Sequence, residues 1–487
     1  MAMHFDLTIT GGTVATASDT FRCDIGIRGG RIVAMGELTG AAERTIDATG
    51  LLVLPGGIDS HCHIDQDTSS GARTADDFYS GTVSAAFGGT TTIISFACQH
   101  RGQSARAVVA DYHARAKDKA VADYSFHIII TDPTKQVLGQ ELPALIRAGY
   151  TSFKIYLTYD RLKIDDRQAL EVLDLARRDN AMVMVHAENH EVIKWLTENI
   201  LREGYTAPKF HAVAHDRLAE REATHRAITL AEVVDTRVLI VHVSSREAME
   251  EIAHAQRRGC SVFAETCPQY LFLSDENLEG DGFAGAKFVC TPPPRGRENQ
   301  EHIWRGIATG VFQVVSSDHA PFRFDDAQGK LLNGTNAPFS KIPPGIPGLE
   351  TRLPLLFSAG VNGGRISLNR FVELSATNHA KIYGLHPRKG TIAIGSDADI
   401  AIWDPLKKVT ISREILHDNM DYTPYEGIVV TGWPVITISR GAVICENGRL
   451  AARPGRGEFL TRDPEAASAL PSRVPAREHW RTKLSHS

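Results

Sequence analysis

Residues 52–63 read LVLPGGIDSHCH, an apolar run that ends in two histidines separated by one residue. The run predicts a buried β-strand. Alternate side chains of a strand point to the same face, so His61 and His63 are expected to lie together at its carboxyl end. Two imidazoles on one face satisfy the geometric demand of a metal ion for paired ligands.

Seven further apolar runs of strand length follow in the chain. With the first they give eight predicted strands, at residues 52–63, 90–97, 124–131, 152–157, 182–186, 238–243, 261–265 and 312–318. Amphipathic helical patterns such as DDRQALEVLDLARRDN and SREAMEEIAHAQRRG lie between them. This alternation predicts an α/β fold of the TIM-like (β/α)8 barrel type. A doubly wound open sheet would also alternate, but no Gly-x-Gly-x-x-Gly turn follows the early strands.

Both ends of the chain are rich in short strands between glycine turns, whereas the middle is not. We therefore expect a small β-sandwich domain built from residues 1–55 plus 388–455, with the catalytic barrel, residues 56–387, inserted between them. Residues 456–487 are expected to form a C-terminal extension that contacts a neighbouring subunit, since Leu470 and Trp480 are costly to leave in water.

Composition excludes several classes of protein. The net charge of −5 comes without a basic block, which argues against nucleic acid as a partner. No apolar run approaches the length of a membrane span, and the amino terminus lacks a signal-peptide pattern. The seven cysteines are scattered without a Cys-x-x-Cys pair, as in a reduced protein. We expect a cytoplasmic protein that does not bind membranes.

Residues that can bind a metal recur at the carboxyl ends of the predicted strands. His186 ends the fifth strand, His242 lies near the end of the sixth, and Asp318 ends the eighth. In a β/α barrel these strand ends converge on one mouth. One such histidine alone is more often a structural residue, but the set at corresponding positions indicates a metal centre.

Lys154 interrupts the apolar strand TSFKIYLTYD, residues 151–160. An ammonium group cannot bind a metal, because it has no lone pair. Burial and nearby cations lower the pKa of a lysine, which can then take up CO2. The resulting carbamate has two oxygens that can span two metal ions. Four histidines, an aspartate and this lysine exceed the needs of one zinc, so Lys154 is predicted to be an N6-carboxylysine.

The segments LPGGIDSHCHID, SFKIYLTY, VHAEN, HVSS, AETCPQYLFL, VCTPPPR and SDHAPF occur in this order. With them the chain resembles the dihydropyrimidinases and D-hydantoinases, cyclic-amide hydrolases of the amidohydrolase superfamily, as far as about Arg462. The resemblance implies zinc-dependent hydrolytic opening of a cyclic ureide or imide. A 5,6-dihydropyrimidine would give an N-carbamoyl-β-amino acid, and a hydantoin would give an N-carbamoyl amino acid.

The resemblance also implies a site with two zinc ions per subunit, bridged by a hydroxide. One zinc would be held by His61, His63, Lys154 and Asp318, and the other by Lys154, His186 and His242. Asp318 would in addition accept a proton and pass it to the leaving nitrogen. Relatives are mostly homotetramers with C-terminal extensions that cross between subunits, so a homotetramer is expected.

Three further residues would bind the substrate. By the resemblance, Tyr159 donates to the developing oxyanion, and Thr291, where the family usually has serine, contacts the substrate amide through its backbone. Pro344 replaces an asparagine that helps to hold the ring in relatives; it keeps a carbonyl but has no N–H. The loop with Gln66 and Asp67 replaces an apolar loop, which favours a smaller or more polar exocyclic group.

The sequence leaves two other functions open. One is a different cyclic amidohydrolase, such as an allantoinase, dihydroorotase or cyclic imidase, and the other is a non-catalytic dihydropyrimidinase-related scaffold. Dihydroorotases place an arginine two residues after the His-x-His pair, where this chain has Asp65, which would repel a substrate carboxylate. A scaffold is disfavoured because all six ligand positions are filled.

Overall fold

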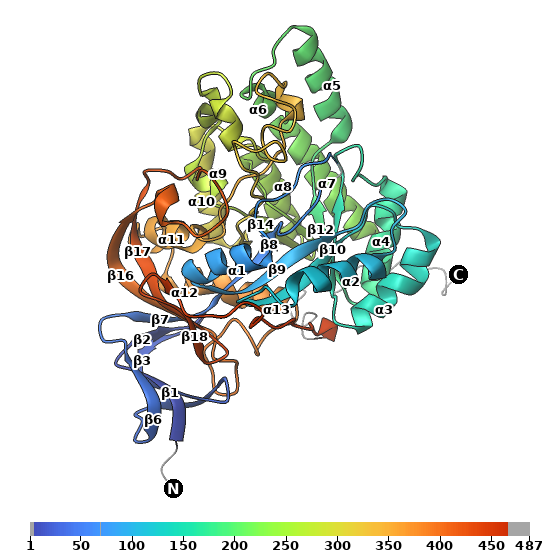
Figure 1. Ribbon diagram of the computed structural model, residues 1–487. Helices are drawn as coiled ribbons and strands as arrows, with labels where there is room; N and C mark the ends of the chain where they lie inside the picture. The colour runs from blue at the N-terminus through green and yellow to red at the C-terminus, as the bar shows by residue number, and fades with distance from the viewer. Residues whose placement is uncertain (1–3, 69, 466–487) are drawn as a thin grey trace.

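A computed structural model describes residues 4–68 and 70–465. Its central element is an eight-stranded parallel sheet in which every strand lies beside its neighbours in sequence (Figure 1). The strands are β8 (Gly57–Cys62), β9 (Thr90–Cys98), β10 (Asp123–Ile129), β11 (Ser152–Tyr156), β12 (Met182–His186), β13 (Val238–Ile240), β14 (Val262–Thr266) and β15 (Val314–Val315).

The first and last strands of this sheet meet and close it into a barrel. Cys62 and His319 form a parallel bridge, and the His63 amide donates to the His319 carbonyl at 2.7 Å. Arg352, fully buried, donates from Nη1 to the carbonyls of Ile58 and Val315, at 2.9 Å each. The predicted (β/α)8 barrel is thereby confirmed.

Helices surround the barrel on its outer face (Figure 1). The predicted amphipathic stretches form α4, which Asp165 caps, and α8, which Ser245 caps. The helices are α1 (Phe78–Phe87), α2 (Ala105–Ala116), α3 (Leu142–Arg147), α4 (Asp166–Arg178), α5 (His190–Arg202), α6 (Phe210–Ala214), α7 (Arg217–Val234), α8 (Arg246–Arg257), α9 (Gln269–Phe272), α10 (Arg297–Thr309), α11 (Arg352–Leu356), α12 (Leu368–Val372) and α13 (Asn378–Ile382).

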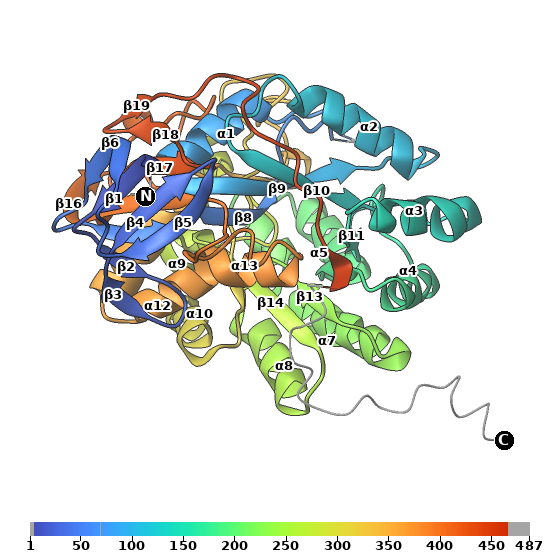
Figure 2. The ribbon, with the colours of Figure 1, turned by 90° about the horizontal axis from the view of Figure 1, so that it is seen from below.

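Two smaller sheets lie beside the barrel and share a buried aliphatic core (Figure 2). One has the order β5-β4-β1-β6 and the other β19-β18-β17-β16-β7-β2-β3, so the second combines strands from both ends of the chain. Their strands are β1 (His4–Thr10), β2 (Thr13–Ala15), β3 (Thr20–Arg22), β4 (Asp24–Arg28), β5 (Arg31–Gly36), β6 (Ala41–Asp47), β7 (Leu52–Pro55), β16 (Ile400–Thr410), β17 (Val429–Ser439), β18 (Ala442–Glu446) and β19 (Arg449–Leu450). The boundaries given above for the two domains stay a prediction.

The predicted strand at residues 52–63 is wrong as a single strand. It divides at Gly56 into β7, which pairs with β16 of the smaller sheet, and β8, which pairs with β9 of the barrel. A Cβ at Gly56 would lie 2.3 Å from Thr91 Oγ1, so only glycine allows this close passage. The chain therefore crosses from one sheet to the other at this point.

The described part of the C-terminal extension packs against the barrel of its own chain. The Gly457 amide donates to Ala120, the Leu460 amide to Tyr124 and the Arg462 amide to Gly149, at 2.7–3.1 Å. The red C-terminal segment is visible across the barrel in Figure 2. Leu470 and Trp480, which the sequence predicts to contact a neighbouring subunit, lie outside the described residues.

We predict that Leu460→Ala destabilises the fold by about 2–5 kcal/mol, because Leu460 is fully buried and its truncation leaves a cavity. Leu406→Ala is the matched control, since that side chain is 80% exposed. Denaturant unfolding of both variants gives the comparison. Equal stabilities would show that the docked C-terminal segment does not contribute to the barrel.

Candidate metal centre

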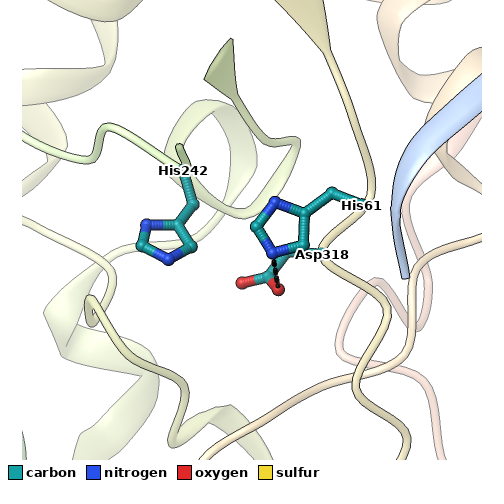
Figure 3. A group of neighbouring side chains, drawn as sticks. All are labelled: His61, His242 and Asp318. Atoms are coloured by element: carbon teal, nitrogen blue, oxygen red, sulfur yellow. Dashed lines mark ion pairs between the residues drawn. The ribbon is translucent and has the colours of Figure 1, made fainter. Parts of the chain in front are cut away.

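Three potential metal ligands meet at the carboxyl ends of the barrel strands. His61 of β8, His242 after β13 and Asp318 after β15 each offer a ligand atom, and these atoms lie within 4.8 Å of one another (Figure 3). All three residues are buried. His61 Nε2 lies 3.1 Å from Asp318 Oδ1. The arrangement brings together residues from both edges of the barrel's closure.

The other three predicted ligands lie next to this group. His63 Nε2 is 3.4 Å from Asp318 Oδ1. Lys154 Nζ is 2.8 Å from His61 Nε2, and His186 Nδ1 is 2.9 Å from His242 Nε2. The structure thus gathers the full predicted set, which consists of His61, His63, Lys154, His186, His242 and Asp318.

Lys154 is 1% exposed, and its ammonium group lies over two aromatic rings, 4.3 Å from the centroid of Phe96 and 5.0 Å from that of Tyr156. Burial lowers the pKa of Lys154 to about 8, although the carboxylates of Asp318 and Glu265 oppose the shift. A considerable fraction of the amine is therefore neutral, and nucleophilic, near physiological pH.

The electrostatics keep lone pairs available on three of the four histidines. Burial lowers the pKa of His63 to about 4, and it also lowers the pKa values of His186 and His242. Burial by itself would raise the pKa of Asp318, but His61 and His63 outweigh it and hold that pKa well below its usual range. Neutral imidazoles beside an ionised carboxylate form a donor set that suits a divalent cation.

Buried side chains fix the orientation of the histidine rings from behind. Glu265 Oε1 accepts from His61 Nδ1 at 2.5 Å, Glu188 Oε2 accepts from His186 Nε2 at 2.7 Å, and Gln66 Oε1 accepts from His63 Nδ1 at 2.8 Å. Such outer partners orient metal-binding histidines and raise their basicity. The sequence pattern by itself indicates no role for Glu188 or Glu265. The only signal was their place at the ends of strands, in VHAEN and AETCPQ.

The residues present fit a metal ion. Each of His61, His63 and His186 has one ring nitrogen bound to a carboxylate or amide and turns the other toward the group. His242 Nδ1 is buried and has no hydrogen-bond partner among the described residues. The cluster is thus a set of nitrogen and oxygen atoms that can bind a metal ion. In three of its histidines the ring nitrogen that carries the proton is already hydrogen-bonded to another side chain.

Three residues of the candidate site have a strained backbone conformation. Tyr159, His242 and Asp318 have φ values of 71°, 38° and 50°, a region that residues other than glycine rarely adopt. Sparsely populated conformations cluster at functional sites, where the surrounding structure holds them.

Of the three predicted substrate-binding residues, Tyr159 lies beside one of the ligands. The Tyr159 and His186 ring centroids are 5.3 Å apart. Thr291 is buried, and its Oγ1 lies 3.1 Å from His211 Nε2. Within residues 4–68 and 70–465, the N–H and C=O of Thr291 and the C=O of Pro344 have no hydrogen-bond partner. These backbone groups are free to bind a ligand.

Comparisons with known proteins agree with this geometry. The model of the amidohydrolase family matches residues 52–444. The chain is 45% identical to the D-hydantoinase of Ralstonia pickettii, over 94% of this chain and 99% of the relative, and 39% identical to the D-phenylhydantoinase of Escherichia coli strain K12, over 94% and 98%. A solved dihydropyrimidinase from Brevibacillus agri superposes with a TM-score of 0.91 at 44% identity, covering 94% of this chain and 98% of that one. None of the described helices is long and apolar enough to cross a membrane.

We predict that Glu265→Gln weakens metal binding by about 10–100-fold, because the neutral amide supports His61 less well. Glu265 also accepts from the His242 amide at 3.1 Å and from Ser316 at 2.7 Å, so both sides of the group depend on it. Competition with a chelator for Zn²⁺ measures the affinity. Glu250→Gln, on an exposed ion pair of α8, is the control and should bind as the unaltered protein does.

Proposed function

The chain belongs to the amidohydrolase family and is a hydrolase of cyclic amides, and from this premise we propose that it opens a cyclic ureide or imide with two zinc ions per subunit. The observation that carries the proposal is the convergence of six potential ligands, five of them buried, beside unpaired backbone groups at the barrel mouth.

The substrate class is a ring with alternating carbonyl and N–H groups. A 5,6-dihydropyrimidine would yield an N-carbamoyl-β-amino acid, and a hydantoin an N-carbamoyl amino acid. The N–H of Thr291 can donate to a ring carbonyl, and the carbonyls of Thr291 and Pro344 can accept from ring N–H groups. Relatives named D-hydantoinase and dihydropyrimidinase support the same class.

Six residues would hold the metals. His61, His63, Lys154 and Asp318 would bind one zinc, and the carbamate of Lys154 would also reach the second, with His186 and His242. When bound, the zinc ions supply a hydroxide nucleophile near neutral pH and polarise the ring carbonyl.

The protein's own groups then move the protons. Asp318 accepts the proton that the nucleophile loses and delivers it to the ring nitrogen as the C–N bond breaks, so that the nitrogen leaves as the neutral NH2 of a carbamoyl or amide group. Tyr159 donates from its hydroxyl to the oxyanion that develops on the attacked carbonyl. Burial raises the pKa of Tyr159 well above its ordinary value, so its hydroxyl keeps the proton that this role requires.

A hydrolysis panel tests the proposal. The zinc-loaded protein is expected to open dihydrouracil or a substituted hydantoin, with succinimide, allantoin and dihydroorotate as the alternatives. Asp318→Asn should fold normally and lose about a hundredfold or more of the rate, whereas Asp281→Asn on an exposed loop should not. Hydrolysis of none of the cyclic amides would exclude the proposed function.

Carbamate formation on Lys154 should depend on pH. Because burial depresses its pKa to about 8, the neutral amine predominates above that pH and is scarce below it. At a fixed concentration of dissolved CO2, metal-depleted protein given Zn²⁺ should recover activity roughly tenfold faster at pH 9 than at pH 7. The carbamate carbon can be followed with ¹³C-labelled CO2. Equal recovery with and without CO2 would contradict carboxylation.

We further propose a homotetramer in which residues 466–487 contact a neighbouring subunit. Ending the chain at Glu465 keeps the segment that docks on the barrel and removes only this part. Light scattering should then show a lower mass, with Zn²⁺ binding retained. An unchanged mass would show that these residues do not hold the assembly together.

A further inference from the structure

Lys330 is a buried cation outside the metal centre. Its side chain is fully buried, and Nζ donates to the carbonyl of Val289 at 2.7 Å and to that of Pro343 at 2.8 Å. No carboxylate of the described chain forms an ion pair with it. Its positive charge is therefore compensated by two peptide carbonyls.

Burying this ammonium carries a free-energy cost. Burial lowers the pKa of Lys330 to about 7, which reports how strongly the site disfavours the charge. A methionine has nearly the same length and would fill the space without that cost. The two hydrogen bonds are what the lysine adds at this position.

These bonds join two separate segments of the chain. Val289 lies two residues before Thr291, and Pro343 immediately precedes Pro344. The Gly345 amide also donates to the Val289 carbonyl, at 2.9 Å, so both partners meet at one oxygen. Lys330 thus fixes the spacing between the segment at residues 289–292 and the segment at residues 343–345.

Side chains also bind the two carbonyls on either side of Thr291 in the first segment. His211 Nε2 donates to the Cys290 carbonyl at 3.0 Å, and the Tyr270 hydroxyl donates to that of Pro292 at 2.9 Å. With Val289 bound by Lys330, the Thr291 carbonyl is the one carbonyl of residues 289–292 without a hydrogen-bond partner among the described residues, and the Thr291 N–H has none there either. The side-chain contacts thereby set the direction in which those groups point.

We propose that Lys330 is a positioning residue for substrate binding, which holds the backbone groups of Thr291 and Pro344 at the separation required by the two sides of a cyclic amide ring. The inference rests on the proposed function, and it adds a residue that touches neither the ring nor the metals. It predicts that Lys330 acts on the binding of the ring and leaves the metal centre unchanged.

Lys330→Met tests this role, because it removes the donors and keeps the length of the side chain. The backbone there is anchored independently, since the Lys330 amide donates to the Arg323 carbonyl at 2.8 Å. KM is expected to rise about tenfold or more, with kcat within threefold and zinc content unchanged, because binding that is equal in the ground and transition states appears in KM. Partial unfolding would instead lower the apparent kcat and leave KM unchanged.

Two further variants sharpen the comparison. Lys341→Met alters an exposed lysine of the neighbouring segment and should leave KM unchanged. Lys330→Gln keeps an N–H donor pair and should give a KM between those of the unaltered protein and Lys330→Met. A KM within twofold of the unaltered protein in Lys330→Met overturns the inference.

If Lys330→Met does not fold, Lys330→Leu, which also lacks the donors, carries the test by the same criterion, and failure of both to fold would make Lys330 a residue of the fold and overturn the inference. An unaltered, zinc-loaded protein that hydrolyses nothing in the panel would instead refute the proposed function itself.

Discussion

Arg352 has its guanidinium group between the first and last strands of the barrel, where it donates to the carbonyls of Ile58 and Val315. Its Nε lies 3.3 Å from the buried carboxylate of Asp59. The last strand is only two residues long, so few backbone bonds join the two edges directly. The buried ion pair and its carbonyl contacts therefore fix the distance across the closure, and with it the distance between His61 and Asp318.

The closure of the barrel determines the geometry of the site, and burial determines the protonation states of its side chains. Dehydration keeps His63, His186 and His242 neutral and Lys154 partly neutral, while Asp318 stays ionised because positive and hydrogen-bonding neighbours surround it. Glu265 acts on both sides of the group, through the His61 ring and the His242 amide. A cluster of this kind is costly for an empty protein and favourable for one that binds cations.

The spacing of apolar residues is sufficient to predict the barrel. The positions of polar residues along the strands are sufficient to single out the six potential ligands, because strand ends in a parallel barrel converge whatever the details of packing. The division at Gly56 was missed because the apolar run continues through it, and only the path of the chain shows that β7 pairs with β16. Glu265 and Lys330 were missed for a related reason: their partners are distant in sequence, and each alone reads as an ordinary surface charge.

Because potential ligands lie on the first and last barrel strands, the site cannot be complete until the last strand has been synthesised. A chain emerging from the ribosome presents His61 and His63 early, and Asp318 only after seven further strands have appeared. Until then the two histidines face water without their carboxylate partner. The last strand therefore completes the barrel and the cation-binding site in the same step, so that a chain interrupted before it has neither a closed sheet nor a full set of ligands.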